Sequence, residues 1–271
     1  MTEAQTILDA GASVVEIRDV GGIKFAIAPD SYSVINLEKH MPSPVRNRGA
    51  IVTSDSPSFI DYLNKYQHQD ASKIYAEIDS DKSHCKLVAV LDDHTKSLPG
   101  WREHTCTFSP KQAVEWTRWI GKNQVKMTQS DFASWLEDNL PDIATVAGMP
   151  TGAEILSMAL GFEANSDKKL RSKVNLQSGG FTFEFVSKED ERTRATMQVF
   201  ERFTIGIPVF DGSANAYPLE SRLKYREKDG VITFWYELIR PDRVFKTAVT
   251  DEVNTIKRDT NLLLIYGSPG L

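Results

Sequence analysis

The sequence predicts a mixed α+β protein whose β-rich N-terminal and C-terminal parts, built of antiparallel hairpins or meanders, flank a central segment of about three helices. Three observations support this class: β-branched runs on both sides of Gly21-Gly22, capped helical patterns in the middle of the chain, and an Asp229-Gly230 turn between two alternating runs. We expect one compact unit, divided into a β-rich part with one short helix (1–108), the helical segment (109–164), and an antiparallel β part that ends with a helix and a last strand (165–271).

The first hundred residues are mainly strand-like. Residues 14–20 and 23–29 flank the two glycines and should form a hairpin, and residues 32–39 should add a third strand. Residues 73–79 and 86–92 alternate apolar and polar side chains, which predicts a second strand pair.

Two helices are predicted from a serine N-cap followed by proline. The first lies within 54–67, with Ser56 as its cap, and the second covers about 110–120, with Ser109 as its cap. Gly121 stands where a left-handed C-cap residue belongs.

Two more helices complete the central segment. One opens at Thr128 and ends near Asn139, and the other follows a capping box at 151–154. Aromatic side chains spaced three apart on these central helices favour core packing over exposed base stacking. They are Trp116, Trp119, Phe132 and Trp135.

The C-terminal part returns to strands. It should end with a helix at about 247–258 and an apolar strand at 262–267. The expected strands before that helix are 181–188, 195–210, 220–227 and 231–238.

Composition sets limits on the class of protein. The 41% hydrophobic share is that of a folded globular chain, and the two cysteines, Cys85 and Cys106, suit a reducing compartment. There is neither a secretory leader pattern nor an apolar run of about 20 residues, so we expect a cytoplasmic protein with no membrane partner. No dinucleotide, phosphate-loop, zinc-protease or nucleophile-elbow fingerprint occurs, which favours a non-enzymatic protein without cofactor or metal.

One short stretch gathers potential acid, base and ligand side chains. Asp92, Asp93, His94 and His104 lie within it, but their spacing matches no zinc pattern. A turn whose polar groups bond to the local backbone is therefore favoured over a metal or catalytic site. His84 and Cys85 are adjacent on a predicted strand and should point to opposite faces.

Basic residues alternate along one predicted strand, at Arg222, Lys224, Arg226 and Lys228. Alternate residues share a face, so this row could follow a phosphate backbone, although it also suits a solvated strand or a protected edge. The net charge of −5 lowers the expectation of nucleic-acid binding, but residues 165–271 carry 17 basic against 15 acidic side chains. Any contact with nucleic acid is therefore expected at this row.

Several segments together resemble the YfdQ-like family of tailed-phage and prophage proteins, in the same order over about residues 10–267. This resemblance implies a phage context and an accessory role in DNA metabolism, but it assigns no catalytic residues. The segments that carry it are residues 58–65, Leu91-Asp92-Asp93-His94, residues 129–139 and Ile207-Pro208-Val209-Phe210.

Three functional hypotheses follow. The first is a homo-oligomeric, non-enzymatic phage protein that binds single-stranded nucleic acid, because assembly would join the basic rows of several copies into one track. The second is a protein-interaction or structural module that engages a phage or host protein and binds no nucleic acid. The third, and least favoured, is a metal-assisted hydrolase built on residues 84–106.

Overall fold

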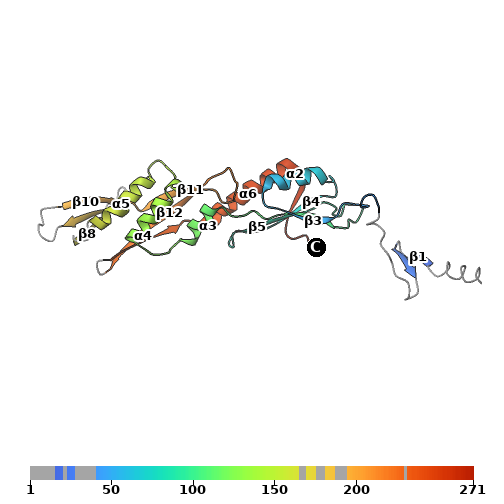
Figure 1. Ribbon diagram of the computed structural model, residues 1–271, viewed down its shortest axis with the longest axis horizontal. Helices are drawn as coiled ribbons and strands as arrows, with labels where there is room; N and C mark the ends of the chain where they lie inside the picture. Colours follow the sequence, from blue (N-terminus) through green and yellow to red (C-terminus); the bar gives the residue numbers. More distant parts are fainter. Residues whose placement is uncertain are drawn as a thin grey trace, which may run out of the picture. The chain divides into compact units, whose positions relative to one another are not determined.

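The computed structural model describes residues 16–20, 23–27, 41–164, 169–174, 181–186, 194–228 and 231–271 (Figure 1). The chain divides into two compact units, residues 1–47 and residues 48–271. The mixed α+β class that the sequence predicted is confirmed, with strands and helices interspersed along the chain.

The first unit contains the predicted hairpin. Strands β1 (Glu16–Val20) and β2 (Ile23–Ile27) pair antiparallel with Val20 opposite Ile23, which confirms the hairpin. The third strand expected at 32–39 lies outside the described residues.

A five-stranded mixed sheet opens the second unit, in the order β14-β4-β5-β6-β3. Its centre is the predicted antiparallel pair, although β5 begins and ends two residues earlier than expected. The two outer pairings, of β3 with β6 and of β14 with β4, are parallel and were not predicted, because they join segments far apart in the sequence. The bounds are β3 (Gly49–Thr53), β4 (Lys73–Asp79), β5 (His84–Val90), β6 (His104–Phe108) and β14 (Leu263–Tyr266).

Helix α2 (Ser56–Tyr66) packs against β6 and buries Phe59 and Leu63. Its N-cap is Asp55, whose carboxylate accepts a hydrogen bond of 2.8 Å from the backbone N–H of Ser58. The prediction of Ser56 as the cap was therefore wrong by one residue. Asp55 is an equally good cap residue, and proline then occupies the second position of the helix instead of the first.

A four-stranded antiparallel sheet follows, in the order β11-β12-β13-β7. Lys228 pairs with Val231 across the predicted two-residue turn, which confirms the hairpin. The bounds are β7 (Met127–Thr128), β11 (Arg202–Ile207), β12 (Tyr217–Lys228) and β13 (Val231–Leu238).

The long strand expected at 195–210 is in fact two strands in two sheets. Strand β11 belongs to the four-stranded sheet, and β10 (Arg194–Val199) belongs to a three-stranded antiparallel sheet of order β10-β9-β8. The other members of that sheet are β8 (Lys169–Val174) and β9 (Phe181–Val186). The prediction failed because the alternation of apolar and polar residues continues through the break, so no local pattern marks the change of sheet.

Helices α3 (Val114–Gly121), α4 (Gln129–Asp138) and α5 (Gly152–Ala164) form the central segment, with the short 3-10 helix η2 (Leu140–Asp142) after α4. Thr128 caps α4 as predicted. The capping box of α5 is also confirmed, since the Glu154 carboxylate accepts a 2.8 Å hydrogen bond from the backbone N–H of Thr151.

The predicted ends of α3 were wrong. The helix begins four residues later than expected, because Gln112 forms an isolated antiparallel bridge with Phe210. Gly121 is the last helical residue, and the C-cap is Lys122 with a φ of −100°, so no left-handed residue ends this helix.

Helix α6 (Pro241–Thr260) is longer than predicted at both ends. Proline occupies its first turn, and Asn261 in the left-handed region ends it. It packs against α2 and β12. Among the helices that the structure describes, none is both long and apolar enough to cross a bilayer.

The core of the four-stranded sheet is aromatic. Trp116 and Trp119 are 1% and 0% exposed, which confirms the prediction that they belong to the core. Phe132 of α4 stacks on Phe234 of β13 with ring centroids 5.1 Å apart. Helix α4 packs against β13 and helix α6 packs against β12, so helices cover the face of this sheet on which Leu223 and Phe234 are buried.

Candidate nucleic-acid interface

Strand β12 alternates as the sequence predicted. Arg222 and Arg226 are exposed and Lys224 is half-buried, whereas Leu223 is buried against the core. These cations therefore share the face opposite the helices. The side chain of Lys228 lies outside the described part of the chain.

The strands beside β12 add to this face. Lys224 lies opposite Trp235 of β13, and Arg226 lies opposite Thr233. Arg222 has neighbours on both sides, Glu237 of β13 and Arg202 of β11. We call the cations and the tryptophan of this surface, Lys126, Arg202, Arg222, Lys224, Arg226 and Trp235, the basic face.

Trp235 is the aromatic member of the basic face. It is half-buried, and its Nε1–H donates a 3.3 Å hydrogen bond to the Glu237 carboxylate. The ammonium of Lys126, just before β7, stands 5.7 Å from the centroid of the ring. An indole with cations beside it is the arrangement on which unstacked bases bind in proteins that hold single strands.

Cations outnumber carboxylates among the described side chains of this surface. Glu220 pairs with Arg202 at 3.7 Å between exposed side chains, and the Glu237 carboxylate is bonded by Trp235. Within the described residues no ion pair forms at Arg222, Lys224 or Arg226. The described side chains of this surface therefore carry more positive than negative charge.

Sequence reasoning found the cations of β12 but missed Trp235, Arg202 and Lys126. The signal for Trp235 was present, since a two-residue turn at Asp229-Gly230 fixes the register and puts Lys224 opposite Trp235. Arg202 and Lys126 reach the site through the non-local pairings of β11 and β7, which no local pattern reveals.

The turn at Asp92-Asp93-His94 follows β5 in the five-stranded sheet. The Asp92 carboxylate accepts hydrogen bonds from the backbone N–H groups of Glu103 and His104, at 3.0 and 2.9 Å. A Cβ added to Gly100 would lie 2.1 Å from the Asp92 carbonyl oxygen, so the returning chain can approach only as glycine. These contacts tie the turn to the start of β6.

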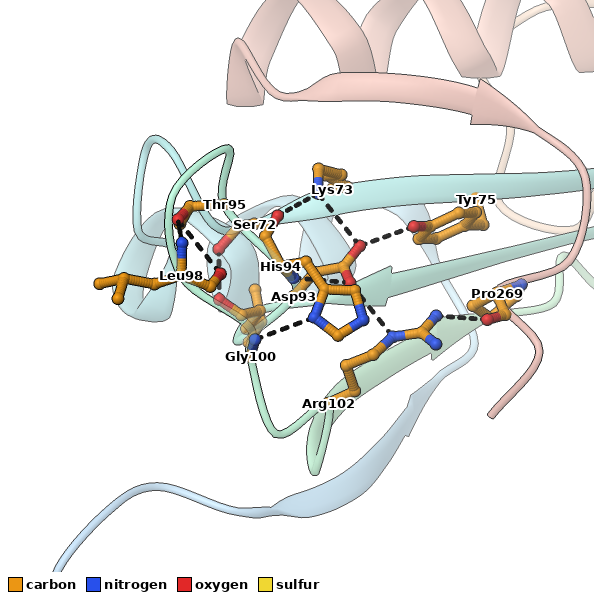
Figure 2. Close-up of polar contacts among 11 residues, drawn as sticks. Ser72, Lys73, Tyr75, Asp93, His94, Thr95, Leu98, Gly100, Arg102 and Pro269 are labelled. Atoms are coloured by element: carbon orange, nitrogen blue, oxygen red, sulfur yellow. Dashed lines mark hydrogen bonds and ion pairs between the residues drawn. The ribbon is translucent and has the colours of Figure 1, made fainter. Parts of the chain in front are cut away.

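Asp93 is the centre of this turn (Figure 2) and is 2% exposed. Its carboxylate accepts a 2.6 Å hydrogen bond from the Tyr75 hydroxyl, and it makes ion pairs with Lys73 at 3.4 Å and Arg102 at 3.1 Å. Burial alone would raise the pKa of Asp93, but the bonds from Tyr75 and from the backbone N–H of His94, together with the two cations, hold that pKa below its usual value. The buried Asp93 carboxylate is therefore ionised, and its charge is compensated by hydrogen bonds and ion pairs.

The two histidines of the stretch face different partners. The His94 Nδ1 accepts a 2.9 Å hydrogen bond from the backbone N–H of Gly100. The His104 ring is buried, its Nε2 lies 2.8 Å from the Tyr62 hydroxyl, and burial lowers its pKa. Because neither ring meets the Asp93 carboxylate, the structure does not join the four predicted residues into one site.

The described residues contain no group of three or more His, Cys, Asp or Glu side chains that could hold a metal ion. His84 is exposed and Cys85 is buried, as expected for neighbours on a strand. The contacts of the turn are those of a structural anchor, and the basic face is the stronger candidate site.

Comparisons with known proteins identify no biochemical activity for this chain. Neither curated proteins nor solved structures gave a significant match to the chain. A family model described as "uncharacterized conserved protein (DUF2303)" matches residues 1–269, and the chain belongs to that family.

Proposed function

We propose that this protein binds single-stranded nucleic acid on its basic face, as a non-enzymatic accessory of phage DNA metabolism in the cytoplasm. The observation that carries the proposal is the pairing of Lys224 with Trp235 on the sheet face opposite the helices, with the Lys126 ammonium 5.7 Å from the same ring. The phage context rests on the resemblance to YfdQ-like proteins noted in the sequence.

The geometry suits a strand laid along β12. Residues 222–228 span about 20 Å at about 3.3 Å per residue, so their cations can contact several successive phosphates. A base can stack on Trp235 when the Lys126 ammonium moves aside to a phosphate. Base stacking on an aromatic ring contributes about 1–3 kcal/mol per base and tolerates any sequence.

Assembly of several copies is part of the proposal, because one short basic face sits on a chain of net charge −5. The edge strands of the five-stranded sheet expose apolar side chains: Val52 of β3 is 74% exposed, and Leu263 and Tyr266 of β14 are 60% and 71% exposed. Open edges of this kind pair readily with another chain. Self-association through them would bring several basic faces into one particle.

We expect light scattering coupled to gel filtration to give a particle heavier than the 30.4 kDa monomer at micromolar concentrations. Replacing the exposed Val52 with lysine should shift the particle toward the monomer, because a charge on an edge strand opposes edge pairing. A monomer across the whole concentration range would rule out assembly.

We expect the fourfold variant Arg222→Gln, Lys224→Gln, Arg226→Gln and Lys228→Gln to bind labelled oligo-dT at least tenfold more weakly than the wild type. The slope of log affinity against log salt should also become shallower, by about 0.7 for each phosphate that the protein no longer neutralises. Fluorescence anisotropy at several salt concentrations measures both quantities.

A matched control removes the same charge from exposed lysines away from the basic face: Lys82, Lys96, Lys246 and Lys257. That variant should keep most of the affinity and the slope. An equal loss of affinity in both variants would mean that net charge, and not the basic face, determines binding. Absence of wild-type binding even at low salt would favour the second hypothesis, a module that engages a phage or host protein, which the acidic net charge supports.

A further inference from the structure

A pocket of about 400 Å³ lies beside the basic face, where β12 continues past the start of β11. Arg202 and Arg222 form the first pair of the β11–β12 ladder, and the backbone N–H of Leu223 donates a 2.8 Å hydrogen bond to the Glu201 carbonyl oxygen just beyond it. A volume of this size is typical of small-molecule sites. The side chains that line it include Phe200, Glu201, Arg202, Arg222, Lys224 and Tyr225.

The wall of the pocket combines aromatic rings with one carboxylate. Phe200 and Tyr225 are both half-buried, and the Tyr225 ring packs against Phe234 with centroids 6.2 Å apart. Burial raises the pKa of Tyr225, and the negative charge of Glu201, which lines the same pocket, raises that pKa further. A flat ring ligand can thus stack on an aromatic side chain while its edge meets a carboxylate.

The rim of the pocket is cationic. Arg202 and Arg222 stand directly opposite each other across the ladder, an arrangement of like charges that destabilises a sheet. The exposed Glu220 carboxylate, 3.7 Å from Arg202, offsets this repulsion weakly. An anion between the two guanidinium groups would relieve it, and Lys224 adds a third positive charge at the same rim.

We infer that this pocket holds one base of a bound single strand and prefers guanine, with Glu201 as the residue that determines this specificity. The inference rests on the proposed function. Guanine presents two adjacent N–H donors, N1–H and N2–H, on its pairing edge, and a carboxylate accepts both in parallel. The other bases place an acceptor beside each donor, and that acceptor would face the carboxylate. The phosphate of the same nucleotide meets Arg202 and Arg222.

The test compares oligo-dT with the same oligonucleotide carrying one central dG or one central dA. We expect the wild type to bind the dG strand about tenfold more tightly than the other two. Glu201→Gln should reduce that ratio to about one, because an amide offers a donor where the second N–H needs an acceptor. Glu137→Gln, an equal charge change on the exposed face of α4, should leave the ratio intact.

Using a ratio separates this inference from the proposed function. Equal binding of all three strands by the wild type would overturn the guanine pocket while the basic face stands. If no strand binds, the proposed function fails, and calorimetric titration with guanosine monophosphate against thymidine monophosphate then decides the pocket alone. Equal or absent binding of these two nucleotides would overturn it, whereas a guanosine preference lost in Glu201→Gln would support it.

Discussion

Trp119→Ala is expected to lower the free energy of unfolding by about 3–5 kcal/mol, the range for removal of a large buried aromatic side chain. Trp119 is 0% exposed and meets three other rings, with centroid distances of 5.1 Å to Tyr236, 5.5 Å to Trp135 and 6.1 Å to Phe203. Its Nε1–H also donates a 2.7 Å hydrogen bond to the Asp142 carboxylate, which the substitution leaves without that donor. Both losses act in the same direction.

Urea unfolding monitored by circular dichroism measures this change. Trp135→Ala serves as the comparison, because the sequence put Trp135 on the buried face of α4 whereas the structure leaves it half-buried and buries Ala133 instead. We expect a clearly smaller loss for Trp135→Ala than for Trp119→Ala. Equal losses would contradict the central position assigned to Trp119.

Asp93→Ala is expected to cost about 3–5 kcal/mol at neutral pH, the range for removing one partner of a buried ion pair. The substitution leaves Lys73 and Arg102 without their shared counter-charge and the Tyr75 hydroxyl without its acceptor. Asp70→Ala, at an exposed position, should change stability by less than about 0.5 kcal/mol.

The pH dependence follows from the lowered pKa of Asp93. In the unfolded chain the Asp93 carboxyl has the ordinary pKa of about 3.9, and above that pH it is ionised in both the folded and the unfolded state, so its stabilisation is fully present. As pH falls below about 3.9, the unfolded chain takes up the proton first, and the stabilisation begins to decrease. It is lost as pH falls further, through the folded value. The difference in unfolding free energy between wild type and Asp93→Ala should therefore be constant from pH 7 to about 5 and shrink below about 4. A difference that does not depend on pH would mean that packing, and not charge, holds the turn.

Local signals in the sequence predicted local structure well. The Asp229-Gly230 signal correctly predicted the β12–β13 hairpin and the alternation of its faces. The capping box at 151–154 correctly predicted the start of α5. Prediction failed where a distant segment decides the outcome. The bridge of Gln112 to Phe210 moves the start of α3 to a later residue than predicted. The change of sheet near residue 200 divides the single strand predicted there into β10 and β11.

The candidate site shows the same division. The cations of β12 could be read from a strict alternation, and Trp235 could have been reached from the register of the hairpin. The pocket could not have been predicted from the sequence. It lies where the β11–β12 pairing ends at Arg202 and Arg222 while β12 continues, and only the non-local pairing of the two strands determines that position. The choice between an anchored turn and a reactive site at Asp93 likewise depended on Arg102 and Tyr75, which only the folded sheet brings to the carboxylate.

The parallel outer strands of the five-stranded sheet also bear on how the chain is made. β14 pairs with β4 through Leu263 and Lys73, so 190 residues of synthesis separate the two partners. At about 5–20 residues per second, the outer edge of β4 stays open for roughly 10–40 seconds on the ribosome. During that interval the nascent chain exposes a strand edge to its neighbours on the same messenger, and pairing of such sequence-distant segments is intrinsically slow. Delayed closure of this edge is thus the step at which a chaperone would have the most to protect.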